Sequence, residues 1–180
     1  MPSIDLTNVQ ESTGGAYNLE PGGYVMVVTD YKVDNSKGYC QLMLDVAEGE
    51  RKGFYARSQR PLSIFLSWSN LDRLGFLKHH LHMFADSNAG FDSNAAFQHD
   101  QWQQFVGRYI GCVVRMEMHT YEGKDYENSE VASTTTVDAI RSGDFVVPGP
   151  RDRRERGAAT AAPNPPAAPV ATAVEKMPWE

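Results

Sequence analysis

Cations and aromatic rings occur together in several short stretches of the chain, and this mixture is the strongest chemical signal in the sequence. Between Arg51 and Arg60 there are four cations and no acid. Cations can follow the phosphates of a flexible polynucleotide, and exposed rings can stack on its bases, each stack contributing about 1–3 kcal/mol. The alternative is that these residues are ordinary tyrosines of a β-structure and solvated charges. We predict a nucleic-acid-binding surface with the following members: Tyr39, Arg51, Lys52, Phe54, Tyr55, Arg57, Arg60, Tyr109, Arg115, Tyr121, Lys124 and Tyr126.

The overall charge opposes simple attraction to a polyanion. The formal net charge is −6, whereas phosphate binding is driven by Lys and Arg. However, binding depends on the local patch rather than on the sum over the whole surface. The stretch 51–60 and the mostly basic stretch 151–156 are two such patches.

Other chemistry is poorly represented. His79 and His82 are one helical turn apart and could share a metal ion, but no cysteine or paired acid stands near them, so a polar helix face with His80 is the preferred interpretation. The chain has no Gly-rich phosphate loop, zinc-protease helix or nucleophile elbow. We therefore expect no enzymatic activity, no cofactor and no metal.

The elements that must position these residues follow from hydrophobic periodicity and turn signals. In residues 39–48, Cys40, Leu42, Leu44 and Val46 alternate with polar positions, as in a half-buried strand. Leu71, Leu74, Leu81 and Phe84 recur at helical spacing after a capping Ser69 or Asn70. The full prediction is strands at 24–31, 39–48, 54–68 (broken near Pro61), 108–118 and 126–137, helices at 70–85 and 100–106, and a short helical turn within 138–145.

Three strands, a helix-rich stretch and two further strands is the element order of the OB-fold, a Greek-key barrel that commonly binds oligonucleotides. The predicted fold class is therefore mainly β: a five-stranded OB-fold-like barrel with a helix-rich insertion between strands 3 and 4. We predict an N-terminal arm at 1–20, docked through Ile4, Leu6 and Val9, and the barrel domain at 21–147. Residues 148–180, rich in Pro and Ala, are predicted to be a disordered tail, because they cannot bury enough apolar surface.

Four short motifs resemble a family of phage-encoded proteins associated with DNA replication and recombination modules. They are Gly22-Gly23-Tyr24-Val25, residues 47–55, residues 105–111 and, above all, residues 140–148 (Ile-Arg-Ser-Gly-Asp-Phe-Val-Val-Pro). The resemblance covers roughly residues 15–150. The family is similar to OB-fold single-stranded DNA-binding proteins, and the resemblance implies that function here.

The C-terminus is similar to that of bacterial single-stranded DNA-binding proteins, which end in a disordered linker and a tip with Pro and an aromatic residue. This chain ends in Pro178, Trp179 and Glu180. The similarity implies that these three residues dock replication or recombination proteins, or that the tail self-associates into a homo-oligomer. The alternative is a terminus without a selected role.

The sequence therefore predicts sequence-independent binding of single-stranded DNA in phage DNA replication or recombination. A β-barrel adaptor for a phage recombinase or replication factor, without DNA binding of its own, is the alternative. The N-terminus lacks the features of a secretory signal, and the two cysteines, Cys40 and Cys112, fit reduced core thiols. We therefore expect the cytoplasm of the bacterial host as the location, and no membrane partner.

Overall fold

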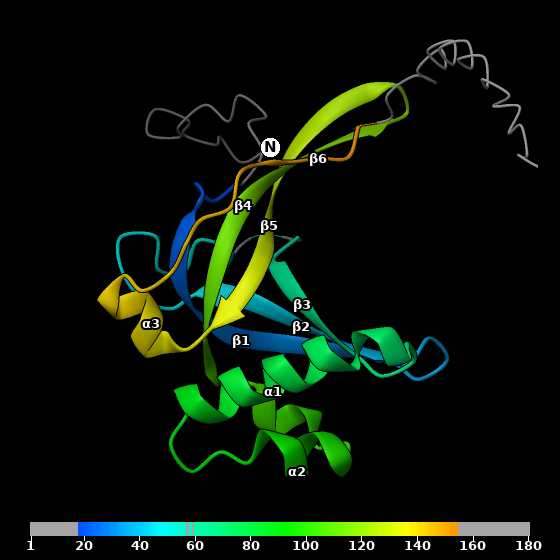
Figure 1. Ribbon diagram of the computed structural model, residues 1–180, viewed down its shortest axis with the longest axis vertical. Coiled ribbons are helices and arrows are strands. Elements are labelled where there is room, and N and C mark those ends of the chain that lie inside the picture. Colours follow the sequence, from blue (N-terminus) through cyan, green and yellow to red (C-terminus); the bar gives the residue numbers. More distant parts are fainter. Residues whose placement is uncertain (1–17, 57, 59, 155–180) are drawn as a thin grey trace, which may run out of the picture.

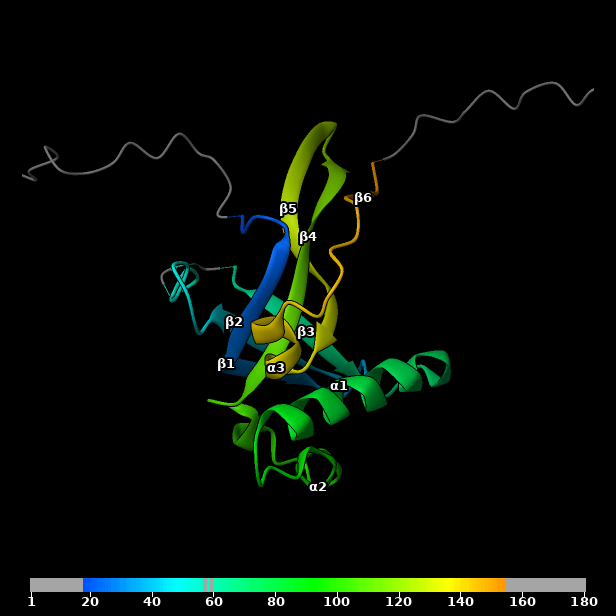
Figure 2. The same ribbon diagram turned by 60° about the vertical axis from the view of Figure 1, so that its left-hand side comes forward.

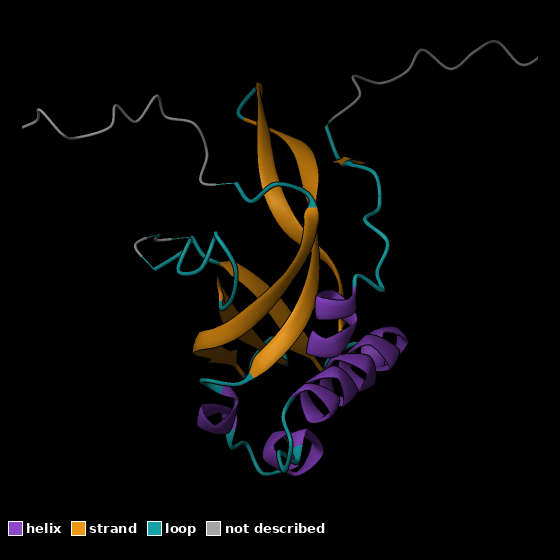
Figure 3. Ribbon diagram, turned by 90° about the vertical axis from the view of Figure 1, so that its left-hand side faces the viewer, coloured by secondary structure: helices purple, strands orange, loops and turns teal. Residues whose placement is uncertain are grey.

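The computed structural model describes residues 18–56, 58 and 60–154 as a mainly β structure with a few helices (Figure 1). Its strands are β1 (Gly22–Asp34), β2 (Tyr39–Val46), β3 (Leu62–Ser67), β4 (Tyr109–Tyr121), β5 (Lys124–Thr135) and β6 (Arg151–Asp152). The strand order is β3-β2-β1-β4-β5, with every neighbouring pair antiparallel, and the short β6 pairs with β4 in parallel. The strands cross at steep angles, so the sheet is strongly curved (Figure 3).

The predicted helix-rich segment lies between β3 and β4. It contains two 3₁₀ turns, η1 (Leu71–Arg73) and η2 (Trp102–Phe105), and the helices α1 (Leu74–Ser87) and α2 (Ser93–Gln98). The Asn70 side chain accepts a hydrogen bond from the Asp72 N–H, as a cap at this position should. Helix α2 was not predicted from the sequence; Asp92 caps it by accepting a hydrogen bond from the Ala95 N–H. Helix α3 (Val137–Ser142) follows β5, within one residue of the predicted helical turn.

The core is formed by side chains of β1 to β4 together with the helical segment between β3 and β4. The predicted alternation of β2 is confirmed, since Cys40, Leu42 and Leu44 are fully buried. Leu77, Leu81 and Phe84 present the buried face of α1 to the same cluster. Helices α1 and α2 therefore cover one end of the sheet, and the long β4–β5 hairpin projects from the opposite end (Figures 1 and 2).

The third predicted strand is too long. Residues 51–56 form turns, and β3 starts only at Leu62. The turn is held by the Asp45 carboxylate, which accepts hydrogen bonds from the N–H groups of Val46 and Tyr55. Aromatic and apolar residues in this segment thus fold back onto the end of β2 instead of extending along it.

Both ends of the predicted domain also differ from expectation. The predicted tail is wrong at its beginning, because residues 148–154 are described and Arg151–Asp152 pair with β4 as β6. At the other end Leu19 is buried in the core, and Asn18 forms hydrogen bonds with backbone groups of Glu127 and Ser129 on β5. The proposed docking residues Ile4, Leu6 and Val9, and the tail from residue 155 onward, lie outside the described residues.

Cys40 and Cys112 are both unpaired and buried in the core, as predicted. Burial raises the pKa of the Cys40 thiol to about 12 and also raises that of Cys112. None of the helices in the described part of the chain is long and apolar enough to cross a membrane.

Candidate nucleic-acid interface

The residues predicted to form one binding surface are divided among separate places. Tyr121, Lys124 and Tyr126 lie together at the end of the β4–β5 hairpin, all exposed. The Tyr126 ring stacks on His119 with 5.8 Å between ring centroids. Tyr109 lies at the start of β4, where its backbone N–H and C=O are held by the Asn88 side chain at the end of α1. Tyr109 and Tyr121 therefore lie at opposite ends of β4.

Two members of the predicted set have structural roles, and the prediction that Tyr55 offers an exposed ring is wrong. Tyr55 is 4% exposed, and its hydroxyl group shares a 3.1 Å hydrogen bond with Ser129. Burial also raises the pKa of Tyr55, so its phenol stays neutral. Arg115 is half-buried in a 2.5 Å ion pair with Glu130 on the neighbouring strand, so it is not a free cation.

The remaining predicted cations and rings surround the β2–β3 loop or lie on its strands. Lys52 and Arg60 are exposed, and Arg51 lies 3.5 Å from Glu20. Phe54 packs partly against the core, edge-on to Tyr55. Arg57 lies outside the described residues, as do Pro178, Trp179 and Glu180.

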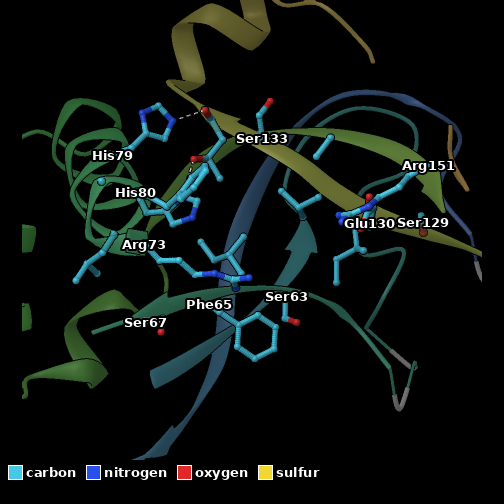
Figure 4. A pocket seen from close by; sticks show the side chains of 18 of the residues that line it. Ser63, Phe65, Ser67, Arg73, His79, His80, Ser129, Glu130, Ser133 and Arg151 are labelled. Atoms are coloured by element: carbon cyan, nitrogen blue, oxygen red, sulfur yellow. Dashed lines mark hydrogen bonds between the residues drawn. The ribbon is translucent and has the colours of Figure 1, made fainter. Parts of the chain in front are cut away.

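A groove that the sequence did not predict separates β3 from β5. These strands are the two ends of the sheet order, and the space between them has a volume of about 1070 Å³. The residues of its wall come from β3, from η1 and α1, from β5 and from the segment around β6 (Figure 4). The groove therefore brings together four segments that are far apart in sequence.

Two consecutive histidines attach α1 to the β5 side of the groove. His79 Nε2 lies 2.9 Å from the Thr134 carbonyl oxygen and therefore donates to it. His80 Nδ1 lies 2.8 Å from the Thr134 hydroxyl oxygen. Burial lowers the pKa of His80 to about 4, which keeps the ring neutral and able to accept from the hydroxyl group. The histidines thus act as structural hydrogen-bonding groups, and the described residues contain no group of three or more metal-ligating side chains.

The groove carries the mixture of rings and cations that the sequence analysis sought elsewhere. Phe65 on β3 and Phe76 on α1 are 50% and 68% exposed. Arg73 reaches from the helical wall toward β3, and Arg151 lies at the far end of the groove beside Glu130 (Figure 4). Arg153 also lines the groove. Tyr39, from the predicted set, supports this surface because its ring packs edge-on against Phe65 with 5.4 Å between centroids.

Sequence reasoning missed these residues although some signal was present. In β3, Phe65 is out of phase with the buried Leu62, Ile64 and Leu66, so a period of two places its ring on the outer face. Phe76 is likewise off the buried stripe of α1. What the sequence could not provide was the approach of β3, α1 and β5 to one another.

The motif over residues 140–148, which carries the resemblance most strongly, packs against the outer face of β1 and β4. A Cβ atom on Gly23 would lie 2.4 Å from the Phe145 ring, and one on Gly111 would lie 2.5 Å from the Thr136 carbonyl oxygen and 2.8 Å from Ile140. Val113 is buried beneath this cover. In addition, Arg141 forms a two-pronged ion pair with Glu48 of the β2–β3 loop. Phe145, Ile140 and Arg141 of the motif therefore pack α3 and the segment after it onto the sheet.

Comparison with protein-family models finds no family that matches this chain, and comparison with curated proteins finds no significant match.

Proposed function

We propose that this protein binds single-stranded DNA without sequence preference, through the groove between β3, α1 and β5. The rings of Phe65 and Phe76 would stack on bases, and Arg73, Arg151 and Arg153 would neutralise phosphates. The motif resemblance adds the context of phage DNA replication or recombination.

The strand order supports assignment of the sheet to the OB-fold class. In this proposal β3 and β5 are the two strands that meet at the seam of the barrel, with α1 beneath them. The long β4–β5 hairpin then corresponds to one of the two loops that OB-folds present to single strands. Its exposed Tyr121, Lys124 and Tyr126 would extend the binding path beyond the groove.

The observation that carries the proposal is the exposure of aromatic rings beside unpaired positive charge in one groove. Exposed phenylalanines cost free energy in water because apolar surface is favourably removed from it. Arg73 has no ion-pair partner among the described residues, although Asp72 stands next to it in sequence. Bases covering the rings and a phosphate near Arg73 would satisfy both groups together.

The test is the affinity for a fluorescent oligo-dT, measured by anisotropy from about 50 to 200 mM salt. We expect affinity to fall steeply with salt, because bound phosphates release counterions. Arg73→Gln should weaken binding and make the logarithmic salt slope shallower by about one. Lys78→Gln is the matched control, because Lys78 is an exposed cation on α1, the helix that follows Arg73 directly, and does not line the groove.

Equal effects of Arg73→Gln and Lys78→Gln would remove the groove from the proposal. Absence of any oligo-dT binding by the full chain at 50 mM salt would contradict the proposed function and favour the protein-only adaptor. The exposed apolar residues Leu71, Leu74 and Phe76 would then be the place to look for a protein partner.

A further inference from the structure

The segment after α3 returns to the sheet as a strap, which we define as residues 146–154. Charged side chains of the strap alternate between the groove side and the opposite side. Arg151 and Arg153 both line the groove, whereas Asp152 and Arg154 do not. This is the alternation that a strand imposes on successive side chains. β6 is in register with β4 through Glu117–Arg151 and Met118–Asp152, and the Arg153 N–H donates to the Met118 carbonyl oxygen at 2.7 Å.

On the side away from the groove, the strap's charges are neutralised within the protein. Arg154 forms hydrogen bonds with both carboxylate oxygens of Asp152, at 3.0 and 2.8 Å, and lies 3.6 Å from Asp125 of the hairpin. Two acids therefore face this one guanidinium group. Arg154 has no charge left over for a ligand.

On the groove side the balance is the opposite. Arg153 Nε lies 2.6 Å from Glu117 Oε1, and Arg151 Nε lies 3.9 Å from the same oxygen. Both guanidinium groups thus approach one carboxylate through their Nε edges, and both side chains remain about half exposed, at 45% and 50%. One positive charge is in excess, and both contacts with Glu117 run through Nε and not through the Nη groups. Guanidinium forks of this kind match the geometry of phosphate oxygens.

We propose that Arg151 and Arg153 form a phosphate-binding site for the DNA backbone, with Glu117 as the resident anion that holds the two side chains at the groove. This inference rests on the proposed function and assigns its strongest electrostatic contact to the strap, which holds the start of the basic stretch 151–156 and was mostly predicted as part of a disordered tail. A phosphodiester would bind the exposed edges of both guanidinium groups, and the Glu117 carboxylate would oppose it by like-charge repulsion.

The experiment compares three full-length variants in the oligo-dT assay. The double variant R151Q/R153Q should make the logarithmic salt slope shallower by about two and weaken binding at low salt. R154Q is the matched control from the same strap and should leave the slope unchanged. E117Q keeps a carbonyl oxygen for the arginines and removes the negative charge, so it should raise the affinity above that of the unmodified protein.

Each outcome bears on one claim. A double variant that binds like the unmodified protein, or R154Q with an equal loss, would overturn the strap site and remove Arg151 and Arg153 from the groove proposal, which would then rest on Phe65, Phe76 and Arg73. Weaker binding by E117Q would overturn the role of Glu117 as a competing anion. Absence of binding by the unmodified protein would instead contradict the proposed function itself. Thermal unfolding of every variant checks that the strap substitutions leave the fold intact.

Discussion

The face of the sheet that α3 covers and the groove between β3, α1 and β5 differ in how closely their side chains pack. On the α3 face, glycines at 23 and 111 allow Phe145, Ile140 and the backbone at Thr136 to approach the sheet within the space of a missing Cβ. In the groove between β3, α1 and β5, large rings and arginines remain exposed to solvent. The α3 face is closed to ligands because its side chains pack against other residues of the chain. The groove is open to solvent, and its exposed rings and cations determine what it could bind.

The comparison also shows that the sequence motifs and the proposed binding groove consist of different residues. The residues that carry the sequence resemblance lie mainly on the closed face, where a glycine or an aromatic ring is required by contact geometry. The groove residues Phe65, Phe76 and Arg73 belong to none of the four motifs. A short sequence motif can therefore reflect a packing constraint, while the residues of the proposed binding groove form no recognisable motif.

The largest effect is expected from Gly111→Ala on the closed face. Its new Cβ would meet the Thr136 and Thr135 carbonyl oxygens at 2.5 and 2.9 Å, and backbone atoms cannot move aside as a flexible side chain can. We expect the free energy of unfolding to fall by about 2–3 kcal/mol, measured by urea denaturation, with unchanged DNA affinity of the folded protein.

Gly75→Ala provides the control for that substitution. Gly75 lies in α1, and a Cβ there would meet nothing within 4 Å. Alanine should be neutral or stabilise the protein by roughly 0.5–1 kcal/mol. Similar destabilisation by both substitutions would mean that the close approach of α3 to β4 is not what fixes Gly111.

A smaller effect, of opposite kind, is expected from Phe65→Ala in the groove. Loss of one stacking ring should weaken oligo-dT binding by about 1–3 kcal/mol and change stability little, because the ring is half exposed. Tyr109→Ala is the control, since Tyr109 is 45% exposed on a strand but does not line the groove. Loss of affinity in Tyr109→Ala with none in Phe65→Ala would place the binding surface elsewhere.

The smallest effect concerns the ion pair that joins the closed face to the β2–β3 loop. The hydrogen bonds from Arg141 lower the pKa of Glu48 below its ordinary value of 4.5. The contribution of this pair to stability is therefore present above pH 4.5 and is lost as the pH falls through the folded-state pKa. Glu48→Gln should destabilise the protein slightly at pH 7 and progressively less as the pH falls below 4.5, and 1 M salt should abolish the difference because the pair is exposed.

Local patterns predicted most of the elements. Strong alternation placed β2, and helical spacing together with a capping Asn70 placed α1. Prediction failed where a distant partner decided the outcome. Asp45 turns residues 51–56 back and buries Tyr55, so the third strand is shorter than its composition suggests.

The binding surface was harder to predict than the elements because it depends on which strand edges meet. The proposed site contains a ring-and-cation mixture of the kind that the sequence analysis looked for, but the sequence could not show that Arg115 pairs with Glu130 or that Arg73 lies opposite β3. β6 was missed for the same reason: two residues of pairing to β4 leave no periodic trace within a basic, Pro-flanked segment.

The placement of the two thiols has a practical consequence for spectroscopy. The sequence contains no cysteines other than the two buried in the core, and a thiol reacts as its thiolate, which burial at both positions disfavours. We therefore expect maleimide dyes to label the native chain very slowly. A single cysteine introduced by Lys124→Cys at the hairpin end would report on that position alone, without removal of either core residue.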